Sequence, residues 1–163
     1  MMNTKMQTAI NDQIQKEFYS AYLYLAMSAY CEESNLSGFA KWLKVQYHEE
    51  MEHGMKLMEH LLERGGKVTL GALAAPPSEF GTPLVMFTEV LKHEEYITAN
   101  INELYEVALA EKDYPVQVML QWFITEQVEE ESNATTILEQ LKLVGDNKGA
   151  LIMLDKELGQ RQD

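Results

Sequence analysis

The chain has 163 residues, a length typical of one domain, and 46% of them are hydrophobic, which is enough for a substantial core. Its 26 acidic and 13 basic residues give a net charge of −13, which argues against nucleic acid or an anionic membrane as a partner and suits metal cations. A single cysteine, Cys31, excludes a disulfide framework and a cysteine-rich metal site. No signal peptide or membrane-spanning run is found, so we expect a cytoplasmic protein.

Hydrophobic residues recur every three or four positions through most of the chain, which predicts long helices. Ser37 is placed to cap the second helix, and Thr82, followed by Pro83, to cap the third. Asp113 and Asp146 are expected to cap the fourth and fifth. The predicted helices cover residues 4–34, 38–64, 83–111, 114–144 and 147–158, within a single domain spanning 1–163.

Residues 65–82, GGKVTLGALAAPPSEFGT, read as one long connection because glycine and proline cluster there. Short turns join the first helix to the second and the third to the fourth, so each pair should form an antiparallel hairpin. The connection could reach roughly 55–60 Å when extended, enough to run the length of a bundle. We therefore expect an all-α four-helix bundle with one long crossover and a short fifth helix at the C-terminus.

Each of the four long helices places a glutamate on the face that should be buried, near its middle. These residues are Glu17, Glu50, Glu94 and Glu130. A buried, unpaired carboxylate costs several kcal/mol, and no lysine or arginine shares these faces as a counter-ion. Two divalent cations would balance the four charges. On the third helix the predicted core face also contains Leu84, Leu91, Thr98 and Tyr105.

The residue types narrow the choice of metal. Glu50 and His53 form a Glu-x-x-His motif, whose spacing puts both side chains on one helix face. Carboxylates with one imidazole suit iron or manganese better than zinc. The motif alone is common by chance, but a matching glutamate on three other helices makes the combination specific.

With these motifs the whole chain resembles the ferritin family, and within it the bacterial non-haem ferritins. The resemblance is carried by Glu17, Tyr24, Glu49, Glu50, Met51, Glu52, His53, Glu94, Trp122, Glu126, Gln127, Val128, Glu129 and Glu130. It implies a ferritin-like fold and a role in iron storage and detoxification. Fe²⁺ would be oxidised by O₂ or H₂O₂ at a di-iron ferroxidase centre inside each subunit, and ferric oxyhydroxide mineral would be stored in a hollow shell of 24 identical subunits.

The resemblance also implies residue roles. Glu17, Glu50 and His53 would bind the first iron, with Glu50 bridging to a second iron held by Glu94 and Glu130. Further matches are Gln127 as a hydrogen-bond partner beside the second iron, Tyr24 and Trp122 as electron donors during O₂ reduction, and Glu49, Glu126, Glu129 and Glu130 as a third iron site.

The position of a second Glu-x-x-His motif is occupied by Gln127, Val128, Glu129 and Glu130, so the second imidazole is absent. This argues against a bacterioferritin and suits iron that passes through as substrate. No haem is expected, although Met51 lies where a bacterioferritin would ligate it. Other hypotheses are a rubrerythrin-like peroxidase, a manganese catalase, a DNA-protecting mini-ferritin, and a structural bundle that binds no metal.

Overall fold

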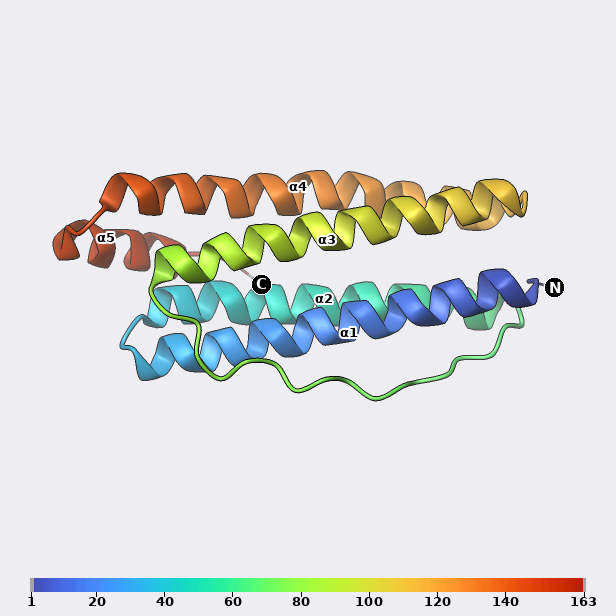
Figure 1. Ribbon diagram of the computed structural model, residues 1–163, viewed down its shortest axis with the longest axis horizontal. Coiled ribbons are helices and arrows are strands. Elements are labelled where there is room, and N and C mark those ends of the chain that lie inside the picture. The colour runs from blue at the N-terminus through green and yellow to red at the C-terminus, as the bar shows by residue number, and fades with distance from the viewer. Residues whose placement is uncertain (1, 163) are drawn as a thin grey trace.

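The computed structural model describes residues 2–162 and contains five α-helices, with no strand in that range (Figure 1). The helices are α1 (Thr4–Glu33), α2 (Ser37–Glu63), α3 (Pro83–Ala110), α4 (Tyr114–Val144) and α5 (Lys148–Leu158). Every helix end lies within one residue of its predicted position. Residues 1 and 163 of the predicted domain lie outside the described residues. Within the described range, no helix combines the length and the apolar character that crossing a membrane requires.

Two antiparallel hairpins, α1 with α2 and α3 with α4, pack into a four-helix bundle (Figure 1). The crossover from α2 to α3 runs the length of α1 on the outside of the bundle, so α2 and α3 point the same way. Asn11 and Gln15 of α1 hold it there through hydrogen bonds to the backbone oxygens of Lys67 and Ala72, at 2.9 Å each. The predicted all-α bundle with one long crossover is confirmed.

The predicted helix caps are correct at two positions and wrong at two. Thr82 and Asp113 accept hydrogen bonds from the first turns of α3 and α4, as predicted. Asn147, not Asp146, caps α5, because its side chain is the one that accepts from the backbone N–H of Ala150.

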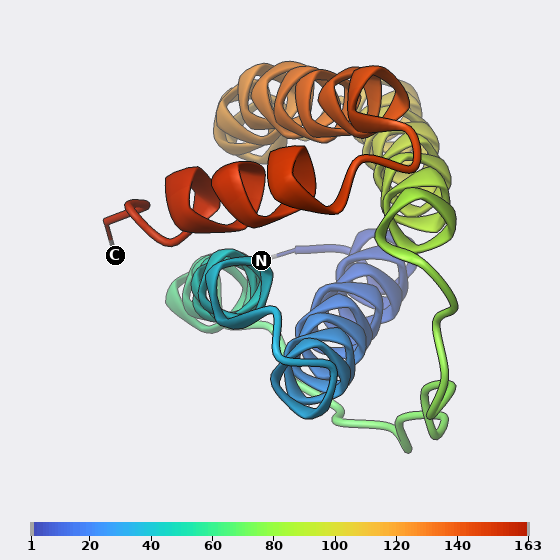
Figure 2. The same cartoon turned by 90° about the vertical axis from the view of Figure 1, so that its left-hand side faces the viewer.

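The start of α2 is capped by a distant residue. Ser37 is the first residue of the helix rather than its cap, and Leu36 before it makes no side-chain capping bond. The carboxylate of Asp155 in α5 instead accepts from the backbone N–H groups of Gly38 and Phe39, at 2.9 and 3.0 Å. These two bonds fix α5 across the end of the bundle, between α4 and α2 (Figure 2).

The hydrophobic core is divided into two clusters. One lies at the α5 end and includes Phe39 and Phe87, and the other lies toward the N-terminus and includes Ile10 and Phe123. A layer of buried polar side chains lies at the middle of the four helices. The fold therefore places the polar layer where packing shields it from solvent on both sides.

The predicted core face of α3 is wrong at four positions. Leu84 is 40% exposed, and Leu91, Thr98 and Tyr105 are only partly buried. These residues are seven apart, so they form a line along the edge of the apolar face. The core positions on this helix are Met86, Phe87, Val90, Glu94, Ile97, Ile101, Leu104 and Ala108.

Candidate metal centre

The four helices bring the predicted metal ligands to one level of the bundle. Glu17 comes from α1, Glu50 and His53 from α2, Glu94 from α3 and Glu130 from α4. All five side chains are between 0 and 4% exposed. Glycine at position 54 allows α1 to approach α2 here, since a Cβ atom would lie 2.3 Å from the ring of Phe18.

Three ligand atoms converge without hydrogen-bond partners. The Nδ1 atom of His53 lies 3.4 Å from Oε2 of Glu50 and 3.9 Å from Oε2 of Glu17. All three atoms are buried, and none has a hydrogen-bond partner among the described residues. Buried polar atoms are normally paired, so the group fits a cation placed between them. They lie within 4.8 Å of one another, a separation that one metal ion can bridge.

The opposite oxygens of the same carboxylates are held by amides. Gln13, one turn before Glu17, donates to its Oε1 atom at 2.8 Å. Gln46, one turn before Glu50, donates to its Oε1 atom at 3.3 Å and to Oε2 of Glu130 at 2.6 Å. These amides aim the free oxygens at the centre. Neither glutamine was predicted to belong to the site, although the i, i+4 spacing of each from its glutamate was a signal that could have revealed both.

Two other residues that were predicted to belong to the site hold the carboxylate of Glu94. The Tyr24 hydroxyl donates to its Oε1 atom, and Gln127 donates to Oε2 at 3.2 Å. Gln127 also contacts Thr98 Oγ1 at 3.2 Å, which orients its amide. Tyr24 and Gln127 thus lie directly beside a predicted ligand of the second iron.

Without metal, the carboxyl groups of the centre favour their protonated forms, because burial and repulsion between neighbouring carboxylates both disfavour ionisation. Burial raises the pKa of Glu17 and of Glu50 well above the usual range, and neighbouring carboxylates raise both further. Burial, and then the charges of Glu94 and Glu49, raise the pKa of Glu130 to about 8. The pKa of Glu94 is raised by burial as well. Bound cations would reverse this preference by stabilising the ionised carboxylates.

Part of the predicted third site also comes together. Nε2 of His53 lies 4.0 Å from Oε1 of Glu126, and Glu130 supplies a third possible ligand atom to this group. Glu129 is exposed to solvent. The carboxylate of Glu49 accepts a 2.6 Å hydrogen bond from Arg161 instead of joining the group.

Trp122 lies against the histidine of the centre. Its ring makes an edge contact with His53 at a centroid distance of 5.4 Å, and the side chain is 39% exposed. The ammonium of Lys56 lies 4.0 Å from the Trp122 ring centroid. This indole therefore connects the buried centre to the surface.

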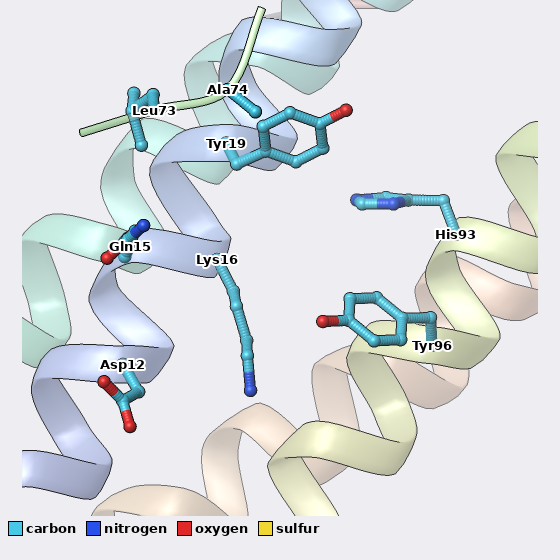
Figure 3. A pocket seen from close by; sticks show the side chains of 8 residues that line it. All are labelled: Asp12, Gln15, Lys16, Tyr19, Leu73, Ala74, His93 and Tyr96. Carbon is cyan, nitrogen blue, oxygen red and sulfur yellow. The ribbon is translucent and has the colours of Figure 1, made fainter. Parts of the chain in front are cut away.

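A cavity of about 480 Å³ lies on the outer side of the bundle, between α1, α3 and the crossover (Figure 3). Its walls include Lys16 and Tyr19 from α1 and His93 and Tyr96 from α3. His93 contacts Ser20 Oγ at 2.7 Å, and its ring packs edge-on against Tyr24. Burial lowers the pKa of His93 to about 4, so its ring is neutral at pH 7. The cavity contains none of the predicted metal ligands.

The fold and the converging acids define a four-helix bundle with a cluster of carboxylates and one imidazole in its core that could hold metal. Residues 7–144 match the family model described as "Ferritin-like domain". The chain is 40% identical to a bacterial non-heme ferritin of Bacteroides fragilis (strain 638R), over 99% of this chain and 100% of the relative. It is 37% identical to a bacterial non-heme ferritin of Staphylococcus aureus (strain USA300), over 99% of this chain and 97% of the relative.

The same similarity extends to solved structures. An open-pore ferritin from the hyperthermophilic archaeon Archaeoglobus fulgidus superposes with a TM-score of 0.98 at 48% identity, covering 99% of this chain and 100% of that one. A form of that ferritin engineered to be closed also gives a TM-score of 0.98, at 48% identity and 99% coverage of both chains. The chain belongs to the ferritin family, as its sequence motifs indicated.

Proposed function

We propose that this ferritin oxidises Fe²⁺ at the buried centre and stores the ferric product. Iron storage is the role of the family to which the chain belongs. The observation that carries the proposal is the convergence of three unpartnered atoms, from Glu17, Glu50 and His53, in the core. Carboxylate and imidazole are ligands that iron accepts readily.

In this proposal Glu17, Glu50 and His53 bind one Fe²⁺, while Glu94 and Glu130 bind a second that Glu50 bridges. Each Fe²⁺ gives up one electron. O₂ takes both electrons and two protons and leaves as H₂O₂. Binding of iron ionises carboxylates that hold protons in the metal-free centre, which supplies protons close to the reaction.

The remaining candidates have subsidiary roles. Gln127 and Tyr24 hold the carboxylate of Glu94 in place. Tyr24, which touches Glu94, and Trp122, which touches His53, are also proposed as electron donors: their two electrons, with two further protons, would reduce H₂O₂ that has not yet left the centre to two molecules of water. A third iron would bind at Glu126 and Glu130, at the edge of the centre.

We further propose that 24 copies form a hollow cytoplasmic shell in which the mineral grows. The net charge of −13 on each subunit would attract cations to such a shell. Neither haem nor nucleic acid has a part in this scheme.

The deciding experiment measures Fe²⁺ oxidation and iron retention together. Metal-free protein is mixed with Fe²⁺ in air, ferric absorbance is followed by stopped flow, and iron that co-elutes with the protein is counted. The Glu50→Ala variant should oxidise iron at least about 100-fold more slowly, because it loses the bridging carboxylate. Glu59→Gln, an exposed acid on the same helix, should match the parent. Equal rates for Glu50→Ala and the parent would refute the assignment.

A further inference from the structure

Arg161 extends from the segment after α5 to the side of α2. Its Nη1 atom donates to the backbone oxygen of Trp42 at 3.2 Å and to Oε1 of Gln46 at 3.1 Å. Its Nη2 atom donates to Oε2 of Glu49 at 2.6 Å. The guanidinium also stacks 4.4 Å from the centroid of the Trp42 ring. One side chain near the C-terminus thus holds three successive turns of the helix that carries Glu50 and His53.

The docking of α5 determines where this arginine lies. Asp155 bonds to the first turn of α2 through Gly38 and Phe39. A Cβ atom at position 38 would lie 1.6 Å from the backbone oxygen of Asp155, so only glycine permits this approach. The chain then needs only six residues to reach position 161, beside Gln46.

The contact with Gln46 decides which way its amide faces. A guanidinium only donates hydrogen bonds, so the amide oxygen must point toward Arg161. The amide NH₂ group must then point inward, where it donates to Glu130 at 2.6 Å and to Glu50 at 3.3 Å. The reverse orientation would put an amide oxygen against two carboxylates and an NH₂ group against a cation.

We propose that Arg161 is a positioning residue of the metal centre: acting through Gln46, it aligns the carboxylates of Glu50 and Glu130 for metal binding. The proposal rests on the ferroxidase centre proposed above, and it assigns a role there to the C-terminal segment. Arg161 acts without touching any of the five proposed ligands of the two irons. Its bond to Glu49 also keeps that carboxylate engaged outside the group formed by His53, Glu126 and Glu130.

Binding of Co²⁺ to the metal-free, assembled protein tests the proposal without any oxidation. The visible absorbance of Co²⁺ reports both affinity and ligand geometry. Arg161→Gln should weaken Co²⁺ binding by about tenfold, the effect typical of residues that orient metal ligands, and should change the spectrum. Arg64→Gln is the matched control. Arg64 also donates through both Nη atoms, to Asp113 at 2.6 and 3.2 Å, and its side chain is 24% exposed, against 18% for Arg161.

Arg64→Gln should bind Co²⁺ like the parent even where it lowers the melting temperature by a similar amount. Arg161→Lys should stay impaired, because a single ammonium that pairs with Glu49 cannot at the same time hold the Gln46 amide, whereas the guanidinium uses Nη2 for Glu49 and Nη1 for Gln46. Full recovery in Arg161→Lys, or unchanged binding in Arg161→Gln, would overturn the proposal.

A double-mutant cycle tests the route through Gln46. In a Gln46→Met background, Arg161→Gln should cause little further loss of Co²⁺ affinity, because the amide that it orients is already gone. Additive losses would contradict the route. If the parent itself binds no Co²⁺, the proposed metal centre fails; if the parent binds and Arg161→Gln binds equally well, only the role of Arg161 fails.

Discussion

Nδ1 of His53 lies 3.4 Å from Oε2 of Glu50, and neither atom has a hydrogen-bond partner among the described residues. In a core this well packed, such a pair costs free energy unless a third group satisfies both atoms. A divalent cation between the two atoms would satisfy both. The other oxygen of Glu50, Oε1, accepts a hydrogen bond from Gln46 at 3.3 Å, which leaves Oε2 directed at this point.

Replacement of His53 by alanine should abolish rapid oxidation of the first iron. The variant loses the only imidazole of the centre, so we expect the initial rate of Fe²⁺ oxidation to fall at least about 100-fold. His48→Ala is the control, since His48 lies on the same helix but is exposed. Stopped-flow absorbance measures both, and a parental rate in His53→Ala would remove this residue from the ligand set.

Metal-free protein should lose stability as the pH rises, and Glu130 should account for part of the loss. Its pKa is raised from 4.5 to about 8 in the folded state, mainly by burial. The folded state therefore binds the proton more tightly than the unfolded state does. This contribution is complete below about pH 4.5 and is lost as the pH rises toward 8.

The Glu130→Gln variant cannot ionise at this position, so the stability difference between variant and parent should grow from pH 5 to pH 8. A difference of the order of a few kcal/mol is expected at the upper end. Urea unfolding in the presence of a chelator measures it. Parallel pH curves for the two proteins would show that Glu130 titrates normally.

Tyr24→Phe should separate structure from electron transfer. The variant leaves Oε1 of Glu94 without its hydrogen bond, which should cost about 1–3 kcal/mol of stability in the metal-free protein. Electron paramagnetic resonance of freeze-quenched samples should show a tyrosyl signal in the parent during oxidation and none in the variant. A signal of the same size in Tyr24→Phe would assign the radical to another residue.

The third site should depend on Glu126 more than on Glu129. Oε1 of Glu126 faces Nε2 of His53 at 4.0 Å, whereas Glu129 is exposed to solvent. Glu126→Gln should bind one metal ion fewer per subunit in an anaerobic Fe²⁺ titration, with the oxidation of the first two ions little changed. Equal losses in Glu126→Gln and Glu129→Gln would place the third ion farther out on α4.

The assembled protein should have a mass near 24 times 18.7 kDa. Native mass spectrometry at micromolar concentration tests this directly. A monomer or dimer would exclude storage inside a shell while leaving the chemistry of the centre untouched, so this measurement distinguishes storage from a stand-alone oxidase.

Much of the fold could be predicted because helix signals are local. Thr82 with Pro83, and Asp113, mark helix starts through contacts within four residues, and both were identified correctly. The cap of α2 could not be found in the same way, because its acceptor, Asp155, lies more than a hundred residues away. The predicted core face of α3 was wrong at Leu84, which is exposed. A hydrophobic repeat of seven residues marks a stripe along a helix, but it does not say which of two adjacent stripes faces the core.

The burial of four glutamates could be predicted for a different reason. Each of the four long helices has a glutamate that interrupts its apolar face near the middle: Glu17, Glu50, Glu94 and Glu130. Four such interruptions together predict one shared metal site. The sequence showed no inward cation near them. The fold supplies Arg161 from the C-terminal segment, and it reaches Glu49 and Gln46 rather than the ligands themselves.

The helices, the long crossover and the acids that face the core could be predicted from the amino-acid sequence, because they follow from residue spacing along one helix at a time. Which oxygen of each carboxylate is free and which is held is visible only in the folded chain, because that depends on donors from other turns and other helices. Gln46 illustrates the difference: its position was visible in the sequence, but the direction of its amide is determined by Arg161, 115 residues away.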